Sequence, residues 1–139
     1  MEQQIKQIFE WPLRVYYEDT DAGGIVYYAN YLKFCERGRT EWLRSLGVEQ
    51  DGWLASGTSF VVRHVTLDLK APARFNDQLV VKTQVTQVKR ASVSFYQQIF
   101  NQHQQLLCSA DVKAACVSIQ EMKPVAIPAP IAEVIKRGT

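Results

Sequence analysis

The sequence lacks the features that mark membrane, secreted and nucleic-acid-binding proteins. No stretch approaches the roughly 20 apolar residues of a membrane-spanning helix. Residues 1–6 are polar where a secretory signal peptide has an apolar run. The formal net charge is only +2, and the lysines and arginines are scattered along the chain. We therefore expect no nucleic-acid partner, no membrane span or polybasic anchor, and a cytoplasmic location.

Cysteine and histidine are scarce as well. The three cysteines, Cys35, Cys108 and Cys116, are an odd number in dissimilar contexts, so we expect reduced, buried thiols and no disulfide framework. Neither His64 nor His103 lies at zinc-ligand spacing from another histidine or cysteine, which argues against a metal site. No repeat or linker divides the 139 residues, so we expect one domain over residues 1–139.

Residues 16–31 are the stretch best suited to chemistry. Alternation of apolar and polar residues over 13–17 predicts a half-buried strand that ends in three carboxylates within four residues. Gly23 and Gly24 then supply backbone freedom for a turn or for close approach of a substrate. A carboxylate, a glycine-rich turn and a helix N-terminus can together hold a polarised carbonyl beside a base or nucleophile. Aspartate and glycine are also the commonest turn residues, so the spacing alone fits an ordinary turn equally well.

A long helix is predicted after the glycines. Apolar residues recur at intervals of three and four between residues 28 and 46, with charged residues on the other side. Gly47 stands where a left-handed cap is usual, and Gly38 on the apolar stripe would let the helix lie close to its neighbour. Glu36 and Glu41, at the middle of the helix, are ordinarily solvated, although a carboxylate on a dimer-facing side could join a site. The pattern predicts a central helix covered by a sheet.

The second half of the chain predicts strands. Alternating segments at 60–70, 79–88, 93–100 and 106–119 are separated by short connections; the first has a break at Arg63 and one buried face. Residues 49–58 are expected to form a short helix or a flap, and a short helix from 131 to about 137 is expected after the prolines of the tail. The order predicts an α+β domain, with a sheet of about five antiparallel strands wrapped around one long helix. Such a sheet leaves edges uncovered, so we expect it to pair with a second copy.

At this point several motifs resemble a known family. The run Tyr17-x-Asp19-Thr20-Asp21-x-x-Gly24-Ile25-Val26-Tyr27, followed by Ala29-Asn30-Tyr31 and then Glu36 and Arg39, is similar to the 4-hydroxybenzoyl-CoA thioesterase class of hot-dog-fold proteins. The likeness is strongest to its YbgC-like, Tol–Pal-associated branch of acyl-CoA thioesterases. Three further stretches extend it over nearly the whole chain: Phe60-Val61-Val62-Arg63, Ala71-Pro72-Ala73-Arg74 and Met122-Lys123-Pro124.

The resemblance implies a site and an assembly. The family's catalytic aspartate corresponds to Asp21, and the backbone N–H that holds the thioester carbonyl corresponds to Tyr28, where some YbgC-like members have histidine. Gly24, Val26 and Tyr27 are expected to contact the substrate with Tyr28. The resemblance further implies a homodimer or homotetramer with sites between subunits. It implies no cofactor, because coenzyme A enters as part of the substrate.

The chemistry leaves alternatives open. Asp21 could attack the thioester carbon or deprotonate a water molecule, while Asp19 and Thr20 are expected to brace the turn. Lys70, Arg74, Lys89 and Arg90 could meet the coenzyme A phosphates or simply be solvated.

Two other functions compete with this interpretation. One is a magnesium-dependent phosphatase of the haloacid dehalogenase type, which needs a parallel, doubly wound sheet. The other is a non-catalytic hot-dog module that binds acyl-CoA or an acyl carrier protein. The retained acid at Asp21 favours catalysis, because a pure binder of a polyanion gains nothing from it.

Overall fold

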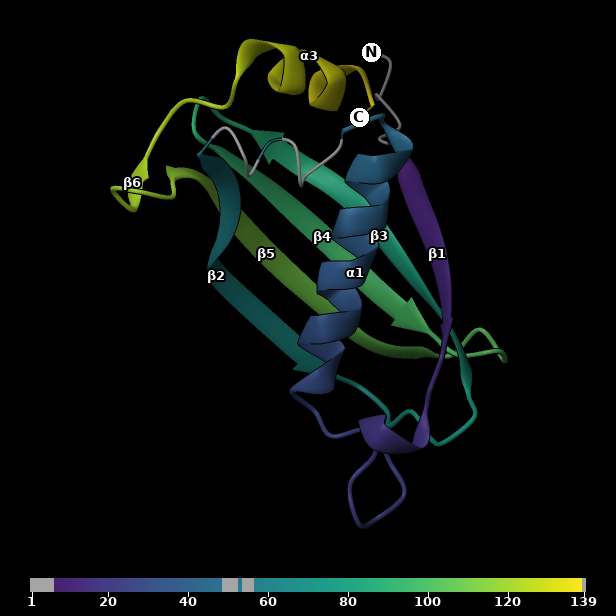
Figure 1. The fold of residues 1–139 in the computed structure, drawn as a ribbon. Coiled ribbons are helices and arrows are strands. Elements are labelled where there is room, and N and C mark those ends of the chain that lie inside the picture. Colours follow the sequence, from purple (N-terminus) through teal and green to yellow (C-terminus); the bar gives the residue numbers. More distant parts are fainter. Residues whose placement is uncertain (1–6, 49–52, 54–56, 139) are drawn as a thin grey trace.

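The computed structural model describes residues 7–48, 53 and 57–138. One antiparallel sheet is ordered β1-β3-β4-β5-β2 and is formed by β1 (Ile8–Arg14), β2 (Thr58–Leu69), β3 (Gln78–Val88), β4 (Ser92–Phe100) and β5 (Leu106–Ser118). A two-residue strand, β6 (Lys123–Pro124), pairs with the end of β5. Helix α1 (Asn30–Ser45) crosses one face of this sheet, and α3 (Ala129–Arg137) lies across one end (Figure 1). The predicted α+β class and the single long central helix are confirmed.

The apolar stripe of α1 is the side that packs on the sheet. Its buried residues recur at helical spacing: Tyr31, Phe34, Cys35, Gly38, Trp42 and Leu43. The helix ends before Gly47, whose φ of +86° is the left-handed conformation predicted for it. A Cβ atom added to Gly38 would lie only 2.8 Å from Cγ1 of Val81 on β3. The missing side chain at Gly38 therefore allows the helix to approach the sheet closely.

A buried polar network joins the helix to the sheet at the same level. The side-chain amide of Gln97, which is fully buried on β4, donates to the carbonyl of Cys35 and to Oγ1 of Thr83, both at 2.9 Å. Its oxygen accepts a hydrogen bond from Nη1 of Arg39, also at 2.9 Å. Each polar atom of this amide is thus satisfied inside the core, which fixes the position of α1 along the sheet.

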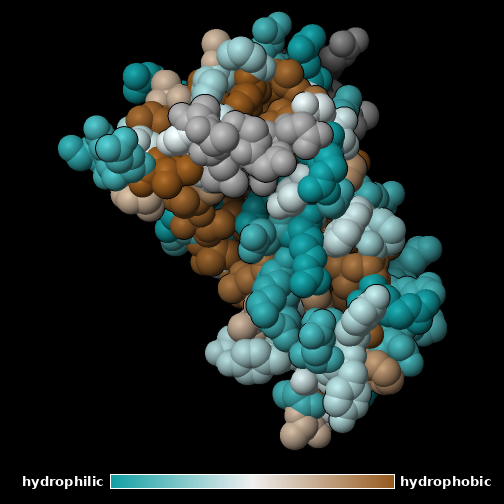
Figure 2. Space-filling model, viewed as in Figure 1, coloured by the Kyte–Doolittle hydropathy of each residue, from teal (hydrophilic) through white to brown (hydrophobic). Residues whose placement is uncertain are grey.

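The prediction that one face of β2 is buried is wrong for the single chain. Most of its residues are exposed, and the exposed fractions of Val62 and Val65 are 49% and 37%. Strand β2 is an edge strand, with only β5 beside it and α1 nearby. The predicted break at Arg63 is a register shift between Val62 and His64, which places Val62, and not Val61, on the same face as Val65. Figure 2 shows apolar surface along the side where Figure 1 places β2.

Strand β1 forms the other edge and both begins and ends earlier in the chain than predicted. It ends at Arg14, and the chain then makes a 3-10 turn, η1 (Tyr17–Asp19), so the alternation through Tyr17 did not mark strand. The backbone N–H and carbonyl of Val15 bond to Asp77 and Asn76, on the side where β3 lies. Because N–H groups alternate between the two sides of a strand, Leu13 and Trp11 also direct their N–H toward β3. By this alternation Pro12, which has no N–H, faces outward on the free edge.

The cysteines and the C-terminal helix agree with expectation. Cys35, Cys108 and Cys116 are free and buried, and burial raises the pKa of the Cys35 thiol to about 11 and that of Cys108 to about 12. Helix α3 begins at Ala129 with a proline in its first turn. No helix among the described residues is long and apolar enough to cross a bilayer. The segment predicted as a short helix or flap, 49–58, lies largely outside the described residues.

Candidate active site

The carboxylate-rich stretch folds into a small hairpin, Asp19–Tyr27, which the sequence did not predict. The N–H of Tyr27 donates to the carbonyl of Asp19 at 3.0 Å, and the N–H of Asp21 donates to Ile25 at 2.9 Å. The turn is closed by a 3.0 Å bond from the Gly24 N–H to the Asp21 carbonyl, and Gly24 has a φ of +78°. Glycine is needed there because other residues rarely adopt a positive φ. The hairpin therefore presents Asp21 at its tip.

The segment after β2 anchors this hairpin. The N–H of Val26 donates to the carbonyl of Ala73 at 2.9 Å, and Ile25 forms an isolated bridge with Arg74. The phenol oxygen of Tyr31 accepts the Ala73 N–H at 2.9 Å, and burial raises the pKa of that phenol. The first turn of α1, the hairpin and the Ala73 backbone are thus held as one unit.

Asn30 completes the support from the helix side. Its amide Nδ2 donates to the carbonyl of Asp19 at 2.9 Å, across the base of the hairpin. The positioning roles of Asn30 and Tyr31 were missed from the sequence. The Ala29-Asn30-Tyr31 motif contains both residues, but their hydrogen-bond partners, Asp19 and Ala73, lie up to 42 residues away in the chain.

The two aspartates have different surroundings. Oδ2 of Asp19 accepts the N–H of Tyr16 at 2.8 Å, and the hydroxyl of Thr20 donates to the Tyr17 carbonyl at 2.7 Å, so both braces predicted for the turn are present. Asp21 is exposed, and its Oδ1 accepts the N–H of Gly23 at 2.8 Å. Among the described residues no cation pairs with Asp21. Its carboxylate is held in position and is open to an incoming molecule.

A pocket of about 230 Å³ opens at the start of α1. It is lined by Ile25, Val26, Tyr28, Tyr31, Leu69, Lys70, Ala71 and Pro72. Tyr28 lies in the turn that leads into the helix, and no backbone group in the described chain accepts its N–H. Unpaired N–H groups at a helix start attract a carbonyl oxygen that gains negative charge.

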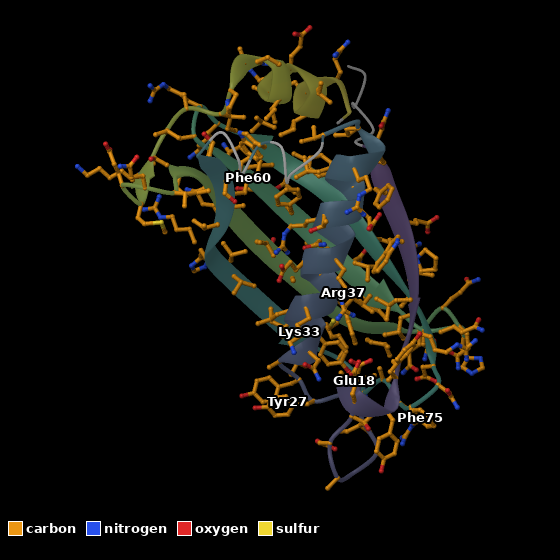
Figure 3. All side chains as sticks on the ribbon, viewed as in Figure 1. Glu18, Tyr27, Lys33, Arg37, Phe60 and Phe75 are labelled. Carbon is orange, nitrogen blue, oxygen red and sulfur yellow. The ribbon has the colours of Figure 1, made fainter. Side chains whose placement is uncertain are left out.

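Not all of the predicted substrate-binding residues meet in this pocket. Val26 and Tyr28 line it, whereas Gly24 belongs to the turn and Tyr27 does not reach it. The Tyr27 ring is 47% exposed and packs on the Tyr28 ring, with 5.0 Å between their centroids. Figure 3 shows Tyr27 at the surface near the start of α1.

Two adjoining hollows lie between α1 and β2, and we call them together the α1–β2 groove. Its first hollow, of about 200 Å³, is lined by Leu32, Lys33, Glu36, Arg39, Val62, Val65 and Val112. The second, of about 320 Å³, is lined by Glu36, Arg39, Thr40, Leu43, Phe60, Val61, Val62, Phe95 and Ala114. Figure 3 shows Phe60 and Tyr27 toward opposite ends of α1. Glu36 and Arg39 line both hollows and Lys33 lines the first, so charged side chains interrupt an otherwise mainly apolar groove.

The four basic residues considered for the coenzyme A phosphates separate into two pairs. Lys70 lines the pocket and forms a 2.8 Å ion pair with Asp68, which raises the pKa of Lys70. Arg74 follows the Ala73 backbone that anchors the hairpin. Lys89 and Arg90 connect β3 to β4 at the opposite end of the sheet from Tyr28 (Figure 1). Within one chain, only Lys70 and Arg74 are near the pocket.

Comparison with known proteins places this fold and site in a family. The model of the thioesterase-like superfamily matches residues 15–135. The chain belongs to this superfamily. The acyl-CoA thioester hydrolase YbgC of Escherichia coli O6:H1 is 45% identical to it over 130 residues, which cover 94% of this chain and 97% of that protein. The acyl-CoA thioesterase YbgC of Haemophilus influenzae is 47% identical over 121 residues, which cover 86% and 88% of the two chains.

Solved structures agree with this thioesterase-superfamily assignment. Slr0204, a 1,4-dihydroxy-2-naphthoyl-CoA thioesterase from Synechocystis, superposes with a TM-score of 0.86 at 27% identity, over 94% of this chain and 96% of its own. The resemblance to YbgC-like proteins and the hot-dog fold are thereby confirmed. The haloacid dehalogenase interpretation is excluded, because that fold needs a parallel, doubly wound sheet. In this chain the strands of the sheet β1-β3-β4-β5-β2 all pair antiparallel.

Proposed function

We propose that this protein hydrolyses acyl-CoA thioesters to a carboxylic acid and free coenzyme A. The observation that carries the proposal is the pocket at the start of α1, where no backbone group in the described chain accepts the Tyr28 N–H and where the hairpin that presents the Asp21 carboxylate ends. Asp21 itself is not among the residues that line this pocket. The YbgC relatives, at 45% and 47% identity, are named for this activity, which supports the same reaction here.

In the proposed reaction the thioester carbonyl oxygen accepts the Tyr28 N–H. The helix N-terminus then stabilises the negative charge that this oxygen gains in the transition state. Either of two steps can follow. The Asp21 carboxylate attacks the carbonyl carbon, the C–S bond breaks, coenzyme A leaves as a thiolate and water later opens the mixed anhydride. Alternatively, Asp21 removes a proton from a water molecule while the water oxygen attacks the same carbon, after which the C–S bond breaks and coenzyme A leaves as a thiolate.

We expect hydrolysis to need no metal ion. Among the described residues, no group of three or more histidines, cysteines, aspartates and glutamates is placed to hold one. The test is release of free thiol from a panel of acyl-CoA substrates of different chain lengths, with and without excess chelator. Equal rates in both conditions are the expected result. Loss of activity that added magnesium restores would contradict metal independence, and tight acyl-CoA binding without turnover on any substrate would favour a binding module.

We also propose that the chain works as at least a homodimer that pairs through β2. This edge strand is 12 residues long and leaves its outer backbone unpaired, and four of its aliphatic side chains are 36% to 50% exposed: Val61, Val62, Val65 and Leu69. An exposed, apolar edge of this length is a template for another strand. An antiparallel copy of β2 would continue the sheet and close the α1–β2 groove.

Light scattering at micromolar concentration should therefore give at least twice the mass of one chain. The physical reason is burial of the β2 edge and of the groove, which a single chain leaves in water. A stable monomer that hydrolyses acyl-CoA would contradict the proposed pairing.

A further inference from the structure

Glu36 and Arg39, which line both hollows of the α1–β2 groove, are close enough for their charges to attract each other, but they form no ion pair with each other. Arg39 is partly buried and donates one hydrogen bond, to Gln97, out of the five that a guanidinium offers. Among the described residues neither Arg39 nor Glu36 takes part in an ion pair. Burial lowers the pKa of Arg39, because the charged guanidinium is partly removed from water.

Another pair on the same helix shows that this is not a consequence of spacing. Glu41 and Arg44 have the same order and the same three-residue spacing as Glu36 and Arg39, and they form an ion pair on the exposed side. Arg39 instead donates a hydrogen bond to Gln97, and no ion pair joins it to Glu36. Lys33 also lines the first hollow, so the groove contains the acidic Glu36 and the basic Lys33 and Arg39, and among the described residues none of the three takes part in an ion pair.

The two charges lie symmetrically about the middle of α1. The helix spans Asn30–Ser45, so its midpoint falls between residues 37 and 38, and Glu36 and Arg39 are equally far from it. Strand β2 spans Thr58–Leu69, so its midpoint falls between residues 63 and 64, and Val62 and Val65 are equally far from that point. These four residues line the same hollow, so the midpoints of helix and strand are at one level.

A two-fold axis at this level would act on the helix and the strand together. It would pair β2 with β2 of the second copy in an antiparallel arrangement and bring the two α1 helices side by side, pointing in opposite directions. In a two-fold interface, if residue i faces residue j, then j also faces i. We propose that Glu36 of each copy pairs with Arg39 of the other, so that two reciprocal ion pairs flank the two-fold axis of the dimer.

This inference rests on the proposed β2 pairing. It adds where the two-fold axis lies and that Glu36 and Arg39 must carry opposite charges. Closing the groove removes Glu36 and Arg39 from water, which is costly for each charge unless it meets an opposite one. The proposed ion pairs require the two α1 helices to lie against each other, with axes about 8–10 Å apart, a distance that facing glutamate and arginine side chains can bridge. The second copy is the occupant that offers complementary charge at both positions.

The test is a pair of charge reversals, Glu36→Arg and Arg39→Glu, each made alone and then mixed. We call each contact between residue 36 of one copy and residue 39 of the other a crossing. In a dimer of either variant alone, both crossings bring like charges together. The dimer dissociation constant should therefore rise by about 100-fold or more, the scale for disrupting a buried charge pair. In an equimolar mixture every crossing again joins arginine to glutamate. Fluorescence-detected sedimentation with one variant labelled should then show heterodimers with a dissociation constant within about tenfold of the parent.

The matched control is the same pair of reversals at Glu41 and Arg44, away from the groove. Glu41→Arg and Arg44→Glu should each dimerise as the parent does, and mixing them should bring no gain. Circular dichroism establishes that every variant is folded. If Arg39→Glu does not fold, Arg39→Met keeps the apolar stem, and its mixture with Glu36→Arg should still favour the heterodimer, because one attractive crossing remains and the like charges are gone.

The possible failures are distinguishable. Folded Glu36→Arg that dimerises as tightly as the parent, or a mixture with no preference for heterodimers, overturns the ion pair and leaves the thioesterase proposal intact. A parent that is monomeric at all concentrations overturns both the ion pair and the β2 pairing. A parent that hydrolyses no acyl-CoA but follows the charge-reversal pattern rejects the proposed activity and supports the ion pair.

Discussion

Replacing Asp21 with asparagine should lower kcat for acyl-CoA hydrolysis by about 100-fold or more, the scale for loss of an acid–base or nucleophilic group. Asparagine keeps the size of the side chain, and its amide oxygen can still accept the Gly23 N–H that now binds Oδ1 at 2.8 Å. The turn should therefore survive while the anion is lost. The measurement is thiol release at saturating substrate, together with the affinity for a non-hydrolysable acyl-CoA analogue, which should change little.

Asp19→Asn is the matched control for this prediction. Asp19 accepts the Tyr16 N–H, so its replacement should alter mainly stability, by about 1 kcal/mol for one weakened hydrogen bond, and retain most activity. Equal turnover by the parent and a folded, dimeric Asp21→Asn variant would show that Asp21 is not the catalytic group. A larger loss of kcat in Asp19→Asn than in Asp21→Asn would show that the catalytic role belongs to Asp19 and not to Asp21.

Gly38→Ala should destabilise the protein although alanine is the better helix former. In a helix interior, intrinsic propensity favours alanine over glycine by about 1 kcal/mol. The new methyl would however lie 2.8 Å from Cγ1 of Val81, which is fully buried and has no room to move. Overpacking of this kind costs about 1–3 kcal/mol. Gly38→Val, with two further methyl groups against the same wall, should lose more. Urea unfolding at one fixed protein concentration measures the change in the free energy of unfolding.

Val81→Ala offers a check on the cause. If contact with Val81 is responsible, the double variant Gly38→Ala/Val81→Ala should be more stable than the sum of the two single changes predicts, because the second substitution makes space for the first. Additive losses would point to the Thr83 and Gln97 side chains, 3.1 Å and 3.3 Å from the added methyl, as the source of the clash.

The sequence predicted the features that depend on local periodicity. The apolar stripe of α1 repeats every three to four residues, so its extent and the left-handed Gly47 could be inferred without tertiary information. The same holds for β3, β4 and β5, whose buried residues alternate. The break at Arg63 was visible as an interruption of alternation, but its effect, which is to turn Val62 toward α1, depends on pairing with β5.

What could not be predicted depends on partners distant in sequence. The hairpin at Asp21 is held by a backbone hydrogen bond from Val26 to Ala73, 47 residues later, and local patterns carry no information about that pairing. The alternation in β2 suggested a buried face because Val65, Leu67 and Leu69 recur at every second residue with polar residues between them. Among the described residues no strand pairs with the outer edge of β2, so the pattern indicated burial that the isolated chain does not supply.

The two edges of the sheet differ in their capacity to accept a further strand. On the β1 edge, Pro12 stands near the middle of seven residues and offers no N–H to a strand arriving from outside. Strand β2 offers 12 residues without a proline. A pair of chains joined through β2 would therefore expose only its two proline-interrupted ends. Association by strand addition would then stop at a closed particle and would not propagate into a fibre.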